Sequence, residues 1–174
     1  MTTAIRPAKT SDIPAITRIY AHGVTHGTSS FELDPPDEAE MARRMGDLVG
    51  KGFPYLAAEI DGVLAGYAYA GPFRTRPAYR YTLEDSVYVA PERQGRGVGR
   101  ALLTALVEAS GQRGFRQMIA VIGDSPNQSG SIALHSALGF SRVGILQHVG
   151  FKHGQWRDSL LMQRALGPGA TTEP

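Results

Sequence analysis

The sequence contains no cysteine, and this absence limits both its compartment and its chemistry. Without thiols the chain forms no disulfide framework, and no mechanism through an acyl-cysteine intermediate is open to it. Residues 1–6 lack the apolar core of a signal peptide, and no hydrophobic run approaches the roughly 18 residues that a membrane-spanning helix requires. We therefore expect a cytoplasmic protein without a membrane partner, in which any acyl transfer proceeds by direct attack.

An excess of charge of one sign is also missing. The formal net charge is +2, from 18 basic and 16 acidic residues, which is too small for a protein that grips a nucleic-acid backbone over a broad face. The histidines include His22 and His26 at the i, i+4 spacing of a helical metal pair, but no further ligands nearby complete a tetrahedral set. We expect neither nucleic acid nor a metal ion as a partner.

What remains is the composition of a globular protein, with 42% hydrophobic residues in a chain of 174. This size suits one domain, which we expect over residues 1–166, followed by a disordered tail over 167–174. After an initial strand, helices are predicted at about 12–22, 37–50, 97–112 and 131–138, and strands at 55–60, 63–70, 82–89, 117–122, 142–147 and 159–164. Asp61 and Gly62 favour a tight hairpin turn between the second and third strands. The order of elements predicts a mixed α/β sheet with helices on both faces.

The most informative segment is 94–100, which reads Gln-Gly-Arg-Gly-Val-Gly-Arg between a strand and a long amphipathic helix. Glycines allow close backbone approach, and the free amides of a helix N-terminus favour a phosphate or pyrophosphate group. The segment lacks the Gly-Lys-Ser/Thr of a P-loop and the third glycine of a dinucleotide fingerprint. A turn that merely lets a helix leave a sheet is the alternative interpretation.

Together with the preceding strand, this segment is similar to the acetyl-CoA signature of the GNAT superfamily of N-acetyltransferases. Within that superfamily, residues 5–164 resemble the phosphinothricin and methionine sulfoximine acetyltransferases, through the motifs at 71–74, 84–89, 131–135 and 150–156. The resemblance implies a mostly antiparallel, twisted sheet of about six to seven strands. It also implies a bulge in strand 82–89, a separation of that strand from the next one, and a homodimer to which Phe151 and Trp156 of the final hairpin would contribute.

The resemblance further implies acetyl-CoA as the co-substrate. The strand would offer backbone groups to the pantetheine arm, although Tyr88 itself points to the other face as a core residue, and the glycine-rich turn would hold the pyrophosphate. Asn127 and Ser131 would add contacts from around the start of the late helix, although loop 123–130 is longer than the family pattern. The implied cofactor-binding residues are Val87, Tyr88, Val89, Gln94, Gly95, Arg96, Gly97, Val98, Gly99, Arg100, Asn127 and Ser131.

Glu84 is the candidate general base. An α-amine is mostly protonated at neutral pH and must lose a proton before it attacks an acyl group. Glu84 lies in an otherwise apolar strand, where burial would raise its pKa toward the working range, and the family assigns the base role to this position. A solvated or ion-paired residue is the alternative, with Asp85 as the competitor because neighbouring strand residues face opposite sides.

His135 stands where many GNAT enzymes carry a tyrosine that protonates the leaving thiolate. The phosphinothricin-type group shares this histidine, so the resemblance implies a catalytic acid, while the alternative is a histidine packed on the helix face. A backbone amide near Val87 would meet the oxyanion.

An amino-acid-like amine would need arginine and hydrogen-bond donors near the acetyl site. The candidate substrate-binding residues are Phe31, Arg74, Tyr79 and Arg80, and solvated loop arginines are the alternative. The predicted function is transfer of acetyl from acetyl-CoA to the amine of a small, amino-acid-like substrate. Acetylation of another small amine or of a protein N-terminus, and a binding module without turnover, remain as alternatives.

Overall fold

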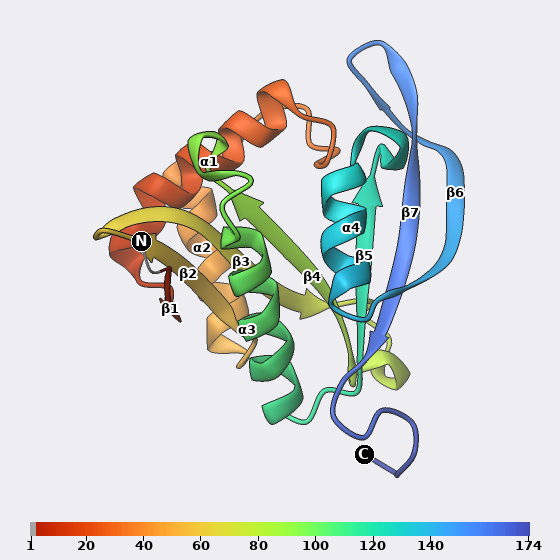
Figure 1. Ribbon diagram of the computed structural model, residues 1–174. Coiled ribbons are helices and arrows are strands. Elements are labelled where there is room, and N and C mark those ends of the chain that lie inside the picture. The colour runs from red at the N-terminus through yellow and green to blue at the C-terminus, as the bar shows by residue number, and fades with distance from the viewer. Residues whose placement is uncertain (1–2) are drawn as a thin grey trace.

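The computed structural model describes residues 3–174, which form one seven-stranded sheet with four α-helices on its two faces (Figure 1). The order across the sheet is β1-β2-β3-β4-β5-β7-β6, and all neighbouring pairs are antiparallel except β4 and β5. The predicted fold class is therefore confirmed. The strands are β1 (Ala4–Pro7), β2 (Tyr55–Ile60), β3 (Val63–Pro72), β4 (Thr82–Val89), β5 (Gln117–Gly123), β6 (Ser141–Lys152) and β7 (Gln155–Ala165). The helices are α1 (Ile13–His26), α2 (Glu38–Gly50), α3 (Val98–Gln112) and α4 (Ser129–Ala137).

Local sequence signals explain where the first elements begin and turn. The Asp37 side chain caps α2 by accepting a hydrogen bond of 2.8 Å from the amide of Glu40. In the β2–β3 hairpin, Asp61 and Gly62 both have positive φ values, 52° and 76°, which is the conformation that a two-residue hairpin turn needs. The predicted hairpin is therefore confirmed.

Helix α1 is longer than the sequence indicated. It was predicted to end near His22, but it continues to His26. Val24 in this extra turn is fully buried, and Gly23 causes no break. Burial of a valine side chain contributes about 1.5–3 kcal/mol, which outweighs the roughly 1 kcal/mol that glycine costs inside a helix.

The two faces of the sheet carry separate cores. Helix α3 covers one face with Leu102, Leu103 and Leu106, all fully buried, while α1 and α2 cover the other face over a group of stacked tyrosines that includes Tyr67. The side chains of β4 divide between these faces. Those of Leu83, Val87 and Val89 pack with the α3 core, and that of Tyr88 packs with the α1 and α2 core, as predicted for Tyr88.

Strands β6 and β7 form a long hairpin beyond the rest of the sheet (Figure 1), longer than the two short strands that were predicted. Most of β6 is exposed although it is rich in apolar residues. The segment predicted to be a disordered tail lies against Arg116, whose guanidinium donates hydrogen bonds to the carbonyl groups of Gly169 and Glu173.

Candidate functional site

The feature that organises the site is a fork between β4 and β5. Their parallel ladder pairs only Thr82 to Asp85 with Gln117 to Ala120, and beyond Asp85 strand β4 pairs with β3 alone. Figure 1 shows the two strands diverging from this point, with α3 and α4 on either side of the opening. The predicted separation of β4 from the next strand is confirmed.

The predicted bulge in β4 is wrong. The ladder between β3 and β4 runs from Gly66–Val89 to Pro72–Leu83 without a shift in register. Continuous pairing on this side keeps the side chains of β4 in strict alternation. The fork therefore opens where the β3–β4 pair and the β5–β7 pair, each in continuous register, separate from one another.

Glu84 lies one rung before the fork, opposite Gly71 of β3 and Ile119 of β5. By alternation with Tyr88 it projects toward the face covered by α1 and α2. The side chain is half-buried, and no cation among residues 3–174 contributes to its titration. Burial first, and then the neighbouring charge of Asp85, raise the pKa of the Glu84 carboxyl above its ordinary value. A carboxylate whose pKa is raised is a stronger base than an ordinary glutamate.

Asp85, the last residue of the parallel ladder, faces the opposite way and contacts α4. Its Oδ2 atom lies 3.0 Å from Nε2 of His135, and both side chains are buried. Burial lowers the pKa of the imidazole, but the hydrogen bond and charge of Asp85 together with the Ser131 carbonyl raise it above 6.5 overall. The structure thus places predicted residue His135 at the base of the fork, but with a carboxylate partner.

The glycine-rich turn lies between β4 and α3. Gly95 and Gly97 have φ values of 71° and 81°, in the left-handed region that glycine adopts without strain. The first hydrogen bond within α3 runs from the amide of Ala101 to the Gly97 carbonyl, at 3.0 Å. The amides of the preceding turn have no partner inside the helix, and the side chains of Gln94, Arg96 and Arg100 are exposed around them. This arrangement suits a pyrophosphate group.

The remaining members of the predicted cofactor set lie near the start of α4. Ser131 is half-buried in its first turn, close to the imidazole of His135. Asn127 is exposed, and its amide nitrogen donates to the carboxylate of Asp124 at 2.9 Å. Gly99 connects this region to α3, because a methyl group there would lie 3.3 Å from the Leu134 side chain of α4. Predicted contacts from the turn and from α4 are therefore brought to the same face of the sheet.

Phe31 lies at the open end of the fork, against β5 and β6. A methyl group added to Gly123 would come within 2.8 Å of its ring, and one added to Gly150 would collide with three ring carbons. Lys152 of β6 is 2% exposed and donates to the Ser30 carbonyl at 2.7 Å. Burial lowers the pKa of this ammonium group. Segment 30–32 is thus fixed to the final hairpin.

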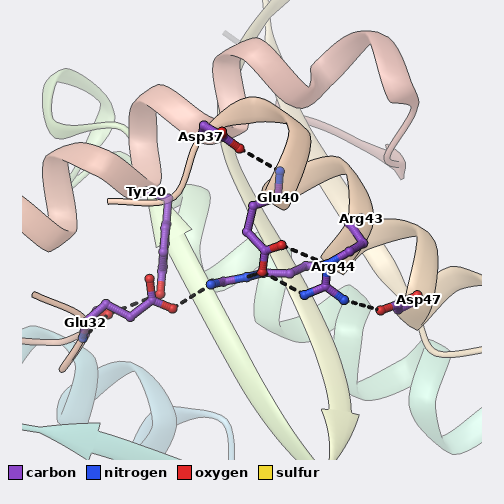
Figure 2. A network of polar contacts seen from close by, with 8 residues as sticks. Tyr20, Glu32, Asp37, Glu40, Arg43, Arg44 and Asp47 are labelled. Atoms are coloured by element: carbon purple, nitrogen blue, oxygen red, sulfur yellow. Dashed lines mark hydrogen bonds and ion pairs between the residues drawn. The ribbon is translucent and has the colours of Figure 1, made fainter. Parts of the chain in front are cut away.

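The same segment is tied to α2 by a chain of charged groups (Figure 2). Arg44 donates to Glu32 at 2.6 Å and to Glu40 at 2.7 Å, and Glu40 in turn accepts from Arg43. In addition, the hydroxyl of Tyr20 lies 3.2 Å from that of Ser30. Segment 30–32 is therefore held from α1, α2 and β6 at once.

The loop between β3 and β4 carries the other predicted substrate residues at the opposite end of β4. Arg74 lies over the Tyr79 ring, 5.4 Å from its centroid, and donates to its hydroxyl at 3.4 Å. Arg80 instead stacks on Tyr81 and lines a cavity of about 430 Å³ with Arg113 and Arg116, next to the C-terminal end of α3. The structure therefore does not bring Arg80 to the face on which Glu84 lies.

A second cavity, of about 260 Å³, lies on the Glu84 face under α2. Its wall includes Tyr69, which pairs with Ser86 two residues from Glu84. Leu48 of the same wall lies next to Gly71, the partner of Glu84 in the ladder. The cavity is lined by Tyr20, Met41, Arg43, Arg44, Asp47, Leu48, Tyr55 and Tyr69.

Sequence reasoning missed three side chains that shape this site: Asp85 as the partner of His135, Lys152, and Arg44. Only Asp85 had a usable signal, since it was recognised as facing away from Glu84. Lys152 and Arg44 act on segment 30–32 through contacts between residues that are 122 and 12 positions apart in the sequence, and such separations leave no periodic pattern.

Among residues 3–174 no group of three or more His, Cys, Asp and Glu side chains could hold a metal ion. None of the helices described is both long and apolar enough to cross a membrane.

Comparisons with known proteins agree with this geometry. Residues 5–161 match a family model described as an acetyltransferase (GNAT) domain. A phosphinothricin N-acetyltransferase of Alcaligenes faecalis is 53% identical over 170 residues, covering 98% of this chain and 86% of the relative. An L-methionine sulfoximine/L-methionine sulfone acetyltransferase of Salmonella typhimurium is 37% identical over 169 residues, covering 97% of this chain and 98% of the relative. The crystal structure of a GNAT superfamily phosphinothricin acetyltransferase from Sinorhizobium meliloti in complex with AcCoA is similar with a TM-score of 0.97 at 49% identity, covering 100% of this chain and 94% of that one.

Proposed function

This chain belongs to the GNAT superfamily of acetyltransferases, and from that premise we propose which of its residues carry the reaction. It is an acetyl-CoA-dependent N-acetyltransferase that acts on small, amino-acid-like substrates. The relatives' names include phosphinothricin and L-methionine sulfoximine, which are α-amino acids with a tetrahedral polar group in the side chain. The substrate proposed for this chain is an amine of the same class.

Glu84 acts as the general base in this proposal, and its position carries the argument. It projects from the rung before the fork, half-buried, with a raised pKa to which no cation among residues 3–174 contributes. In the reaction the substrate ammonium gives a proton to Glu84, and the neutral nitrogen attacks the thioester carbonyl carbon. The carbon–sulfur bond then breaks, the sulfur leaves with the electron pair of that bond, and the nitrogen gives up its second proton to water. General bases of this kind contribute about 10²–10⁴-fold to rate.

The donor is proposed to enter the fork from the α3 and α4 side. There the backbone of Val87 to Val89 has no strand partner on the β5 side, so it can pair with the amides of a pantetheine arm. The amides that begin α3 face the place where a pyrophosphate would lie, with Arg96 and Arg100 beside them. A backbone amide near Val87 would meet the oxyanion.

The amine is proposed to enter from the α1 and α2 side, where Glu84 projects. Phe31 closes the open end of the fork, and Arg74 with Tyr79 supplies cationic and hydroxyl donors beyond the start of β4. We leave Arg80 out of this site because it lines the cavity at the end of α3. Tyr69 is added, because the cavity under α2 comes within two rungs of Glu84.

Release of free thiol from acetyl-CoA, followed with phosphinothricin and with methionine sulfoximine as acceptors, tests the proposal. Glu84→Gln should lower kcat by about 10²-fold or more while acetyl-CoA binding stays unchanged. The matched control is Glu108→Gln, which changes an exposed glutamate on α3. A Glu84→Gln enzyme with the kcat of the Glu108→Gln control would remove Glu84 from the mechanism, and thiol release independent of any added amine would contradict N-acetyl transfer.

A homodimer through the final hairpin is the second part of the proposal. Val143, Ile145, Val149, Phe151 and Trp156 are each more than half exposed, and large apolar side chains gathered on one exposed hairpin are typical of an interaction site. Residues 143–151 contain no Asp, Glu, Lys or Arg, so a second copy can meet this surface without repulsion between like charges. Sedimentation should give a dimer that Trp156→Glu converts to a monomer, and a monomeric wild-type protein would overturn the assignment.

A further inference from the structure

Both ring nitrogens of His135 face hydrogen-bond acceptors. Nδ1 lies 2.7 Å from the carbonyl oxygen of Ser131, one turn earlier in α4, and Nε2 lies 3.0 Å from Oδ2 of Asp85. A carbonyl oxygen can only accept, so Nδ1 carries a proton in every protonation state that keeps this contact. The proton that comes and goes on this ring is therefore the one on Nε2.

Asp85 is the charged neighbour that bears on whether Nε2 is protonated. The Phe140 ring packs edge-on against the imidazole, with 5.0 Å between centroids. Asp85 is the one ionisable group among residues 3–174 that contributes to the titration of His135. Glu84 projects to the other face of β4, and Arg164 of β7 donates to the Leu138 carbonyl at the far end of α4.

The pair also occupies the point at which β4 and β5 part. Asp85 and Ala120 form the last rung of the ladder, so the carboxylate stands where the thioester end of a donor in the fork would approach. Its second oxygen, Oδ1, is buried and accepts no hydrogen bond within residues 3–174. An unpartnered buried carboxylate oxygen is costly, and a structural role alone would not require it to be retained.

We propose that Asp85 is a positioning residue that keeps Nε2 of His135 protonated at the fork, so that a proton is available to the CoA thiolate when it leaves. This inference rests on the proposed function. In the step, the Nε2–H bond breaks, an S–H bond forms, and CoA departs as the thiol. His135 is left as the neutral Nδ1–H tautomer facing a carboxylate, an unfavourable arrangement that favours uptake of a new proton from water.

The first test does not involve the reaction. Nitrogen NMR of the ligand-free protein with labelled histidine, assigned with His135→Gln, should show that the His135 ring loses its second proton only above pH 6.5. In Asp85→Asn the same resonances should show that this proton is lost at a lower pH. A wild-type His135 that titrates at or below the ordinary 6.5 would overturn the proposal even if the variant failed to fold.

The second test is the pH profile of kcat for Asp85→Asn. The alkaline limb, set by loss of the His135 proton, should move to lower pH, and activity should recover toward wild type as the pH is lowered. The acidic limb should move the same way, because removal of the Asp85 charge lowers the pKa of Glu84. A role in packing alone would lower kcat by one factor at every pH, and that outcome would also overturn the proposal.

Asp158→Asn is the matched control. Asp158 also stands beside a histidine, with 3.6 Å between its Oδ1 and Nδ1 of His148, but there the histidine is exposed and the aspartate is half-buried on the final hairpin. Its profile should follow wild type. A wild-type enzyme that released no thiol with any amine would contradict the proposed function, whereas a normal wild-type profile combined with an unshifted Asp85→Asn profile would contradict only the role of Asp85.

Discussion

Replacement of Gly150 by alanine tests the position of Phe31 most directly. The added methyl group would collide with three carbons of the Phe31 ring, while Gly144, on the same strand, has no heavy atom within 4 Å of the same position. Neither glycine has a positive φ value, so alanine is compatible with the backbone at both sites. The difference between the two substitutions should therefore come from the ring alone.

Overpacking of this kind costs about 1–3 kcal/mol, whereas Gly→Ala at an open and compatible position is neutral or stabilises by up to about 1 kcal/mol. Gly150→Ala should thus lower the free energy of unfolding by about 1–3 kcal/mol, and Gly144→Ala should not. In a Phe31→Ala background the ring is gone and the cost of Gly150→Ala should vanish. The double-mutant cycle should give a coupling energy of similar size.

Denaturant titration measures the four free energies, and steady-state kinetics gives the functional readout. A displaced ring should raise KM for the amine while KM for acetyl-CoA changes little, because Phe31 lies on segment 30–32 and away from the glycine-rich turn. Equal stability of Gly150→Ala and Gly144→Ala would show that the ring does not lie on β6. That result would refute the closure of the fork described above.

Three further predictions concern single groups. The raised pKa of His135 means that the folded state binds the imidazole proton more tightly than the unfolded state does. The resulting stabilisation of the fold is complete below about pH 6.5 and is lost as the pH rises through the pKa of the folded state. His135→Gln should therefore reduce the dependence of the free energy of unfolding on pH in this range. Lys152→Met should leave the Ser30 carbonyl without its donor and raise KM for the amine several-fold, which is of the order expected for one lost hydrogen bond, and an unchanged KM would argue against fixation of segment 30–32 by Lys152. Leu102→Ala, in the fully buried centre of the α3 face, should lower the free energy of unfolding by about 2–5 kcal/mol, and a loss below 1 kcal/mol would contradict the assigned core.

Much of the fold followed from local patterns in the sequence. The Asp61–Gly62 turn, the Asp37 cap and the apolar period of α3 each specify their element with nearby residues, and the structure agrees with them. The errors arose where distant packing decides the outcome. Helix α1 continues to His26 because Val24 finds a buried position, and β6 is long because its pairing with β7 resumes at Gly150 after a shift in register beyond Leu146.

The candidate site divides in the same way. The glycine-rich turn could be found because backbone conformation and helix initiation leave a compact signature, and the direction of Glu84 follows from the alternation of a single strand. The partner of His135 could not be found, because it depends on how α4 crosses the fork, 50 residues along the chain from Asp85. The bulge expected in β4 was wrong, because the ladder between β3 and β4 keeps one register from Gly66–Val89 to Pro72–Leu83.

The fork has a consequence for the solubility of the folded protein. Unpaired strand edges recruit strands from other chains and so promote aggregation, and the separation of β4 from β5 creates two such edges in the middle of a sheet. These edges face each other across a wedge that narrows to the Asp85–Ala120 rung, and segment 30–32 with Phe31 covers its wide end. A foreign β-strand needs room along its whole length and cannot lie in such a wedge, whereas a thin, flexible ligand chain can thread into it. An opening that admits a thin ligand chain but not a β-strand therefore also protects the protein from edge-to-edge association.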